Sequence, residues 1–186
     1  MKALNIPVGI SNFEKIRNNG FYYVDKTGLI EELLKTEAEV TLITRPRRFG
    51  KTLGMSMLES FFDIRKNSRK LFEGLEIARQ SELCSKWMNQ CPTVSVSFRQ
   101  VDGLNFTSAY DMLTMVFADL YNKHLYLLED SHVTEFQKKT FTNIAHGCGS
   151  EKEVKSSLVL LTTMMQQHYG KAVVCLLYTS DAADDL

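Results

Sequence analysis

A short basic loop, set between an apolar run and an amphipathic helix, constrains this chain more than any other stretch of it. Residues 44–52 read TRPRRFGKT, follow an apolar run at residues 40–43, and lead into a helical pattern over residues 51–62. Strand, loop and helix in this order, with Gly-Lys-Thr opening the helix, are typical of the phosphate loop of nucleotide-binding proteins. The pattern predicts an α/β fold in which residues 40–43 form a central strand buried on both faces.

The residue types of this loop suit a triphosphate with a bound metal ion. Backbone N–H groups that curl round the phosphates, together with the positive N-terminus of the helix, favour an anion. We expect Lys51 to reach the outer phosphates and the Thr52 hydroxyl to hold Mg²⁺. Arg47 or Arg48 is expected to contact phosphate or to face a neighbouring subunit. The predicted ligands are ATP and Mg²⁺, and the predicted contact residues are Arg47, Arg48, Phe49, Gly50, Lys51, Thr52 and Leu53.

One position departs from the usual G-x-x-x-x-G-K-[ST] pattern, because Arg45 stands where the first glycine is expected. An arginine fits there if Pro46 fixes the loop and the turn needs no positive φ. A plainer interpretation stays open at this point. Gly-Lys-Thr can begin any helix, and the arginines can line a solvated turn.

The acidic half of a phosphate-loop ATPase is missing from its expected place. Such enzymes use an acidic residue at the end of a buried strand to hold Mg²⁺ and to polarise the attacking water. The candidate strand is residues 172–177, after a helix closed by Gly170, so the acid is expected at Tyr178 or Thr179. Neither residue is acidic, and the first acid is Asp181. We therefore predict no catalytic residue in this chain and little or no ATP hydrolysis by it.

Further motifs resemble, in the same order, those of the AAA-ATPase-like family of bacterial and archaeal proteins. Besides the loop, they read IPVGI at 6–10, FEKIR at 13–17, YYVDKT at 22–27, MSML at 55–58, LFEGL at 71–75 and YGK at 169–171. The resemblance runs from about residue 6 to residue 174, and a loop rich in arginine without a first glycine is itself typical of this family. It implies a three-layer P-loop NTPase-type fold, a parallel sheet flanked by helices, with an Asp-Glu pair at positions 178 and 179. Longer members commonly carry a restriction-endonuclease-like nuclease domain after the ATPase domain.

The last residues break this resemblance. Residues 175–185 read CLLYTSDAADD, which resembles a translated transposon end followed by sequencing adapter. Because the break falls where the acidic pair should begin, we interpret residues 175–186 as a non-native tail, with a divergent C-terminus as the alternative. The predicted organisation is a lead at residues 1–39, a truncated ATPase-like core at residues 40–174, and this tail. A sheet left incomplete at the C-terminus would expose apolar surface, so we expect poor solubility or partner-dependent folding.

Composition limits the partners of the chain. Its 22 basic and 22 acidic residues give a formal net charge of zero over 186 residues, so we expect no direct nucleic-acid binding. The four cysteines form no C-x-x-C pair, which fits free thiols in a reducing compartment. With no signal sequence and no apolar stretch that suits a bilayer, a cytoplasmic protein is expected. Its expected partners are a nucleotide, a downstream nuclease domain in a longer protein, and further copies in a homo-oligomer.

Hydrophobic periodicity predicts the remaining elements. A short strand is expected at residues 21–24, a half-buried strand at 93–98, and helices at 29–35, 81–89, 107–128, 132–144 and 150–169. Ser150 and Glu153 make a capping box for the last helix, and Gly170 ends it. His124 is expected to be a packed, hydrogen-bonded core histidine.

Three side chains of the lead are candidates for contact with the adenine ring. They are Phe13, Ile16 and Tyr23, although side chains of these types are more often core residues.

Two other function classes compete with ATP binding. In one, the chain is a non-catalytic protein-interaction module with a vestigial phosphate loop, and a folded protein that fails to bind ATP with Mg²⁺ would favour it. The other class, a nuclease, needs paired carboxylates beside a lysine on adjacent strands, and the sequence offers no such set in this chain.

Overall fold

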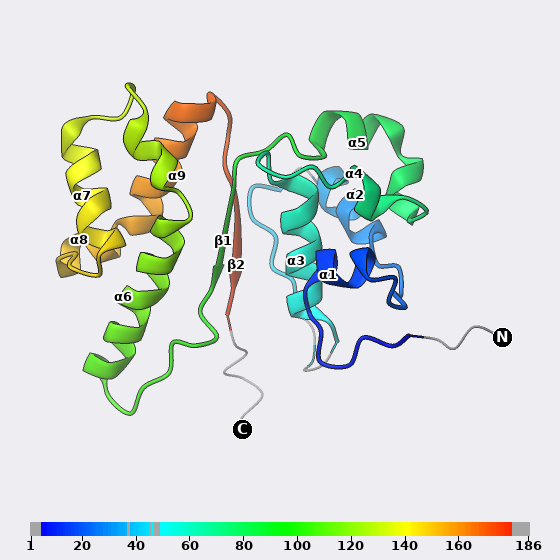
Figure 1. The fold of residues 1–186 in the computed structure, drawn as a ribbon, viewed down its shortest axis with the longest axis horizontal. Coiled ribbons are helices and arrows are strands. Elements are labelled where there is room, and N and C mark those ends of the chain that lie inside the picture. Colours follow the sequence, from blue (N-terminus) through cyan, green and yellow to red (C-terminus); the bar gives the residue numbers. More distant parts are fainter. Residues whose placement is uncertain (1–4, 37, 45, 47–48, 180–186) are drawn as a thin grey trace. The chain divides into compact units, whose positions relative to one another are not determined.

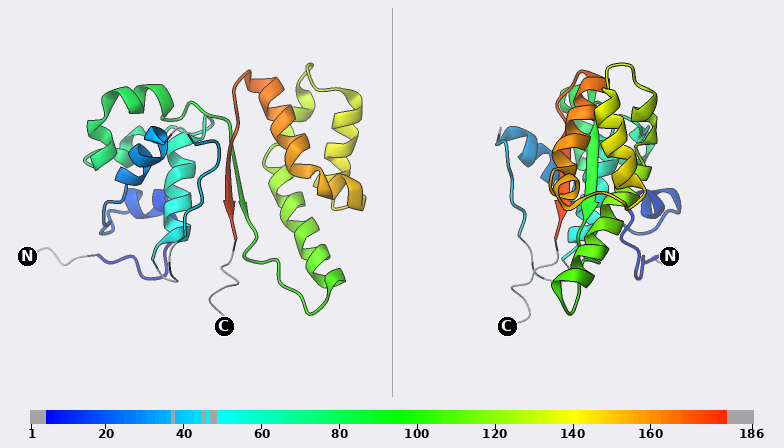
Figure 2. Two further views of the ribbon diagram at one scale, coloured as in Figure 1. Left: turned by 180° about the vertical axis from the view of Figure 1, so that it is seen from behind. Right: turned by 90° about the vertical axis from the view of Figure 1, so that its left-hand side faces the viewer.

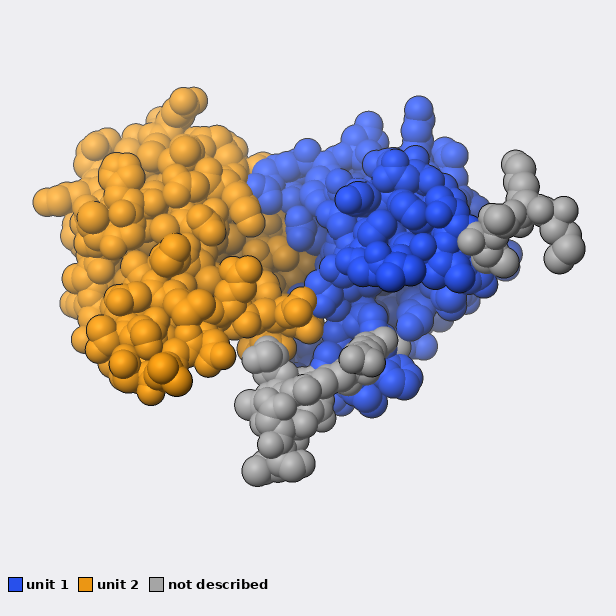
Figure 3. Space-filling model, turned by 60° about the horizontal axis from the view of Figure 1, so that its bottom comes forward, with its two compact units in different colours: residues 1–91 blue, residues 92–186 orange. Residues whose placement is uncertain are grey.

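The computed structural model describes residues 5–36, 38–44, 46 and 49–179. The chain forms two compact units, unit 1 over residues 1–91 and unit 2 over residues 92–186, and Figure 3 colours them separately. The phosphate-loop sequence belongs to unit 1, whereas both strands of the described chain belong to unit 2.

Unit 1 is helical in its described part and is centred on an aromatic cluster. The ring of Phe72 lies 5.0 Å from that of Phe13 and 5.4 Å from that of Phe61, and all three side chains are fully buried. The edge-to-face pair of Phe61 and Phe72 is a favourable aromatic geometry. The helices of unit 1 (Figure 1) are α1 (Phe13–Asn18), α2 (Gly28–Lys35), α3 (Lys51–Phe62), α4 (Arg69–Phe72), the 3-10 helix η1 (Glu76–Arg79) and α5 (Ser81–Trp87).

Polar contacts fix the short helix α1 to α3. The Phe13 backbone N–H donates to Ser56 Oγ at 3.0 Å, and the Ser60 hydroxyl donates to Glu14 at 3.2 Å. The Lys66 ammonium also contacts Glu14, at 2.7 Å. Helix α3, which the phosphate loop precedes, is therefore a supported element of unit 1 rather than an isolated one.

Unit 2 holds a two-stranded parallel sheet beside a layer of helices (Figures 1 and 2). Strands β1 (Thr93–Ser97) and β2 (Val174–Tyr178) pair in register from Thr93 with Val174 to Ser97 with Tyr178. Between the strands come α6 (Phe106–Asn122), the 3-10 helix η2 (Leu125–Glu129), α7 (Glu135–Ala145), α8 (Glu151–Lys155) and α9 (Ser157–Tyr169). Parallel strands need such a long crossover, and helices commonly supply it.

The core of unit 2 joins β1 to these helices. Val94 and Val96 are almost fully buried and pack with Phe117 of α6 and Phe141 of α7. Tyr121 is fully buried too, and its hydroxyl donates to the Ser157 carbonyl at 2.7 Å. Strand β1 confirms the strand predicted at residues 93–98, with Val94 and Val96 buried and Ser97 exposed, although Thr93 is buried as well.

Several predicted elements form close to their expected bounds. Helix α3 covers the predicted residues 51–62, α5 lies within the predicted segment 81–89, and α2 begins one residue before the predicted segment 29–35. Ser150 and Glu153 make the predicted capping box, and Gly170 ends α9 in the left-handed conformation. His124 is buried and its Nδ1 lies 3.2 Å from the Tyr126 hydroxyl, as expected of a core histidine.

The predicted strand at residues 40–43 is wrong. The segment carries no strand, and the side chains of Val40 and Leu42 are 86% and 85% exposed. An apolar run becomes a buried strand only when neighbouring strands take up its N–H and C=O groups. In the described part of the chain β1 and β2 pair with each other, and nothing pairs with residues 40–43. The strand predicted at residues 21–24 is absent as well, because no described strand pairs with this segment.

Three predicted helices are broken or begin later in the structure. The pattern at 107–128 divides into α6 and η2, because the chain leaves the α-helix after Asn122. The pattern at 150–169 divides at Ser156, which ends α8 and precedes α9. Helix α7 begins at Glu135 rather than at 132, where Thr134 caps it. Periodicity continues across such breaks, because a short turn keeps apolar side chains on one side.

Candidate functional site

The candidate site is the turn that begins α3. Gly50 is the N-cap residue, with φ 79° and ψ 23°, which is the left-handed region that glycine adopts most readily. Its carbonyl accepts the Gly54 N–H at 2.8 Å, and the Phe49 N–H donates to the Pro46 carbonyl at 3.4 Å. A glycine at this position therefore has a structural reason as well as a place in the Gly-Lys-Thr motif.

Helix α3 receives no cap from the side chain of its own N-cap residue. Gly50 has no side chain that could accept a hydrogen bond from the first turn, and that turn contains no acidic residue. Lys51, Thr52 and Leu53 form that turn and are half-buried, whereas the Phe49 side chain is 58% exposed. The first amides of a helix and its dipole favour an anion, and here no carboxylate of the turn competes for them.

The structure brings together five of the seven predicted contact residues. Residues 49–53 form the turn and the start of α3. Arg47 and Arg48 lie outside the described residues, as does Arg45, the residue in place of the first glycine. The contacts predicted for these arginines stay predictions.

A lysine from another segment lies beside this turn, and sequence reasoning did not select it. Lys26 Nζ is 3.7 Å from the point where a Cβ on Gly50 would be. The residue lies within the YYVDKT motif, but a lysine 24 positions before Gly50 carries no spacing signal for a phosphate site. Only the folding of unit 1 places its ammonium next to the loop.

The residues on each side of Lys26 are held by hydrogen bonds. Asp25 Oδ1 accepts the Thr27 N–H at 2.9 Å and the Thr27 hydroxyl at 2.7 Å, and Asp25 Oδ2 accepts the Glu76 N–H at 2.7 Å. The buried Thr27 Oγ1 in turn accepts the Ile77 N–H at 3.1 Å. Partial burial raises the pKa of Asp25, but the hydrogen bonds from Thr27 and Glu76 outweigh it and keep that pKa below its ordinary value. We call Asp25 and Thr27, with their bonds to residues 76 and 77, the Asp25–Thr27 clamp.

The candidate adenine contacts are mostly core residues. Phe13 and Ile16 are fully buried, so neither offers a surface to a base. Tyr23 is half-buried, its ring packs edge-on against Phe13, and its hydroxyl donates to Met57 Sδ at 3.3 Å. Burial raises the pKa of Tyr23 to about 12. Tyr23 therefore ties the segment before Lys26 to helix α3.

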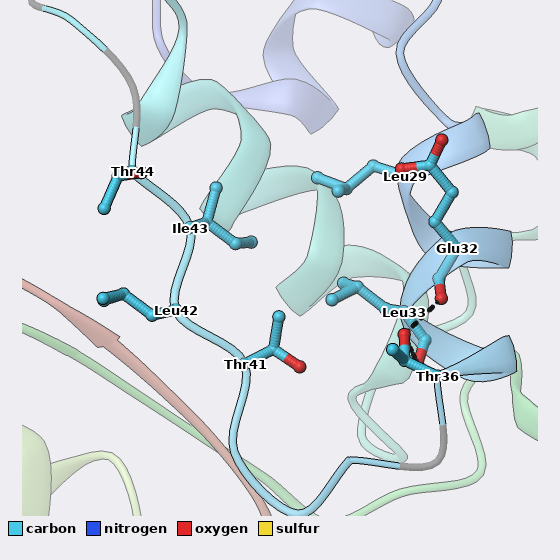
Figure 4. A pocket seen from close by; sticks show the side chains of 8 residues that line it. All are labelled: Leu29, Glu32, Leu33, Thr36, Thr41, Leu42, Ile43 and Thr44. Atoms are coloured by element: carbon cyan, nitrogen blue, oxygen red, sulfur yellow. Dashed lines mark hydrogen bonds between the residues drawn. The ribbon is translucent and has the colours of Figure 1, made fainter.

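A shallow open pocket of about 310 Å³ lies between α2 and the segment before the loop (Figure 4). Leu29 and Leu33 point from α2 towards Ile43 and Thr41, whereas Leu42 points away from them. Its lining residues are Leu29, Glu32, Leu33, Thr36, Thr41, Leu42, Ile43 and Thr44. The only charged side chain among them is a carboxylate, so the pocket itself does not suit phosphate.

The end of β2 carries no acid in its described residues. Tyr178 ends the strand, with the Arg99 guanidinium 5.9 Å from the centre of its ring, and Thr179 follows. Asp181 lies outside the described residues. Strand β2 also crosses the boundary at residue 175, so the predicted non-native tail stays a prediction.

Other classes of site find little support in the described chain. Its His, Cys, Asp and Glu side chains form no group of three that could hold a metal ion. The structure has all four cysteines as free thiols. None of the described helices combines the length and the apolar character that crossing a bilayer requires.

Comparison with known proteins places the chain in a family. Residues 7–182 match the model of the AAA-ATPase-like family, described as Predicted AAA-ATPase. The chain therefore belongs to this family, as its motifs indicated. It is similar to an uncharacterized protein in the vnfD 5' region of Azotobacter chroococcum mcd 1, with 35% identity over 99 residues, which are 53% of this chain. That alignment covers 18% of the relative, so the chain spans a minor part of its length. No solved structure matches the chain.

Proposed function

We propose that the chain binds Mg²⁺·ATP at residues 49–53, as the nucleotide-binding part of an AAA-ATPase-like protein. One observation supports this most directly. Gly50 takes a left-handed conformation at the N-terminus of α3, where Gly-Lys-Thr opens a helix whose first turn contains no acidic residue. Membership of a family described as Predicted AAA-ATPase supports the same function.

The residues of the turn fit the chemistry of a nucleotide phosphate chain. The first amides of α3 would bind phosphate oxygens, and the Lys51 ammonium would neutralise part of their charge. The Thr52 hydroxyl would be a ligand of Mg²⁺, which prefers oxygen donors and is commonly shared with substrate phosphates. Arg47 and Arg48 are proposed to contribute further charge to the same anion.

The fold proposed for the nucleotide-binding part is the three-layer P-loop NTPase type, a parallel sheet flanked by helices. A downstream nuclease domain in a longer protein is proposed from the family resemblance. A homo-oligomer and a cytoplasmic location are proposed as well, as expected from the sequence.

Hydrolysis is not proposed for this chain. Tyr178 and Thr179 stand where the acidic pair is expected, and neither can bind Mg²⁺ as a carboxylate or polarise water as a general base. Binding without turnover is the expected activity. A non-catalytic interaction module with an inert loop is the competing function.

The test is titration calorimetry with Mg²⁺·ATP on the full chain and on Lys51→Ala. We expect Lys51→Ala to weaken binding by about tenfold or more, because a charge-assisted hydrogen bond is lost. Lys70→Ala, an exposed lysine of α4, is the matched control and should bind as the parent chain does. Equal affinity in Lys51→Ala, or no binding by a folded parent chain, would reject the proposed site and favour the interaction module.

A further inference from the structure

We propose that Lys26 is a second phosphate-binding lysine of this site, which contacts the phosphate chain of the nucleotide from outside the loop. The proposal rests on the proposed nucleotide site, and it names a residue that the phosphate-loop pattern does not contain. Its basis is the position of Lys26 Nζ, 3.7 Å from the point where a Cβ on Gly50 would lie. Both residues belong to unit 1.

The Asp25–Thr27 clamp explains how one exposed lysine keeps this place. Hydrogen bonds of 2.7–3.1 Å tie Asp25 and Thr27 to the N–H groups of Glu76 and Ile77. The backbone on both sides of Lys26 is therefore fixed to η1, while its own side chain stays exposed. An ammonium on a flexible four-carbon stem can then adjust to a ligand without moving the backbone.

A second anchor connects the same segment to the helix that the loop opens. The Tyr23 hydroxyl donates to Met57 Sδ of α3 at 3.3 Å, and the Tyr23 ring packs on Phe13. Because α1 is itself fixed to α3 through Ser56, the segment before Lys26 and the start of α3 share one framework. The spacing between Lys26 and Gly50 is thus a property of that framework rather than of the loop sequence.

The chemistry of the surroundings points to a multiply charged anion. Within the described residues Lys26 forms no ion pair, so no carboxylate there neutralises its ammonium. An ammonium has three donors and no acceptor, which matches phosphate oxygens better than the edge of a base, where donors and acceptors alternate. Near the amides of the α3 N-terminus, the ammonium groups of Lys26 and Lys51 would donate hydrogen bonds to a triphosphate and neutralise part of its charge.

The first test is a set of binding titrations on the full chain with Mg²⁺·ATP and, separately, with inorganic tripolyphosphate. Lys26→Met keeps the length of the side chain without its charge, and we expect it to weaken both ligands about tenfold or more. Lys26→Arg should restore binding to within a fewfold of the parent chain. Lys70→Met is the matched control and should leave both affinities unchanged.

The outcomes separate the two proposals. If Lys51→Ala loses binding while Lys26→Met binds like the parent chain, Lys26 has no phosphate role and the proposed function stands. If neither variant loses binding, the nucleotide site itself is rejected. If Lys26→Met loses ATP but keeps tripolyphosphate, Lys26 contacts the nucleoside, and the phosphate assignment is overturned.

A second test needs no variant and so does not depend on the folding of one. An amine-reactive reagent is applied to the full chain with and without saturating tripolyphosphate, and labelling of each lysine is read by peptide mass spectrometry. We expect the ligand to slow labelling of Lys26 severalfold and to leave Lys70 unchanged. Equal labelling rates for Lys26 with and without the ligand would overturn the proposal.

Discussion

The Asp25–Thr27 clamp of unit 1 depends on the side-chain hydroxyl of Thr27. Its side chain is fully buried, donates to Asp25 at 2.7 Å and accepts the Ile77 N–H at 3.1 Å. Buried polar groups are normally hydrogen-bonded, because an unpaired one has lost its water without a replacement. The hydroxyl therefore stabilises the turn at Lys26 and the start of η1 together.

We expect Thr27→Val, which keeps the shape and removes the hydroxyl, to lower the free energy of unfolding by about 1–3 kcal/mol. Thr36→Val is the control and should cost less than about 0.5 kcal/mol, since the exposed Thr36 hydroxyl donates to carbonyls of its own helix. Urea unfolding measures both. Equal costs would show that the clamp does not stabilise the fold.

The cost of Thr27→Val should also depend on pH. The hydrogen bonds that lower the pKa of Asp25 stabilise the fold above the ordinary carboxyl pKa, and this stability is lost as the pH falls and Asp25 is protonated. The variant lacks one of those bonds, so its deficit should be largest near neutral pH and should shrink below about pH 4. The part of the stability loss that comes from the missing hydrogen bond with the Ile77 N–H should persist at low pH.

The segment at residues 40–43 and strand β1 are both rich in β-branched side chains, but they lie in different environments. Val40 is 86% exposed and belongs to no strand, whereas Val94 is fully buried in the core of unit 2. A β-branched side chain favours extended backbone in both places, but only β1 has a partner strand. Pairing rather than propensity decides which run becomes a strand.

The same substitution at both positions tests this difference. We expect Val94→Thr to cost about 1–3 kcal/mol, because it buries a hydroxyl among apolar side chains. Val40→Thr should change stability by less than about 0.5 kcal/mol, because water reaches the side chain. Chemical denaturation of the two variants measures both. A comparable loss in Val40→Thr would mean that residues 40–43 are a buried strand of the folded chain.

The charge balance of the entire chain governs its behaviour in solution. Its formal net charge is zero at pH 7, so copies of the chain repel one another least near neutral pH. Several large apolar side chains are more than two-thirds exposed. They are Val8, Val40, Leu42, Leu104, Phe106, Met115, Phe136 and Val159. Low repulsion together with exposed apolar surface favours association.

We expect the chain to be least soluble near pH 7 and more soluble at about pH 5 and pH 9, where it gains net charge of one sign. Sedimentation velocity at several concentrations should show association that weakens on either side of the minimum. Leu104→Lys, at a fully exposed position, should reduce association near neutral pH by adding charge and removing apolar surface. A monomer whose solubility is constant across this range would contradict the prediction.

Short-range signals predicted much of what the structure contains. Gly50 before Lys51, the capping box of Ser150 with Glu153, and Gly170 at the end of α9 act through neighbours in the chain, so the sequence is enough to find them. Breaks such as the one at Ser156 were missed, because apolar periodicity runs through them. The match to the family confirms the motifs that the sequence had indicated.

Long-range contacts decided the rest. That residues 40–43 stay unpaired while residues 93–97 form β1 depends on which strand is available as a partner, and local residue preference does not contain that information. The approach of Lys26 to Gly50 likewise depends on bonds from Asp25 and Thr27 to residues some fifty positions away. Helix α3 and the glycine at its start could be predicted from the sequence, because the signals that place them are local. The neighbours of that glycine could not be predicted, because the hydrogen bonds and packing that place them form only when distant segments fold together.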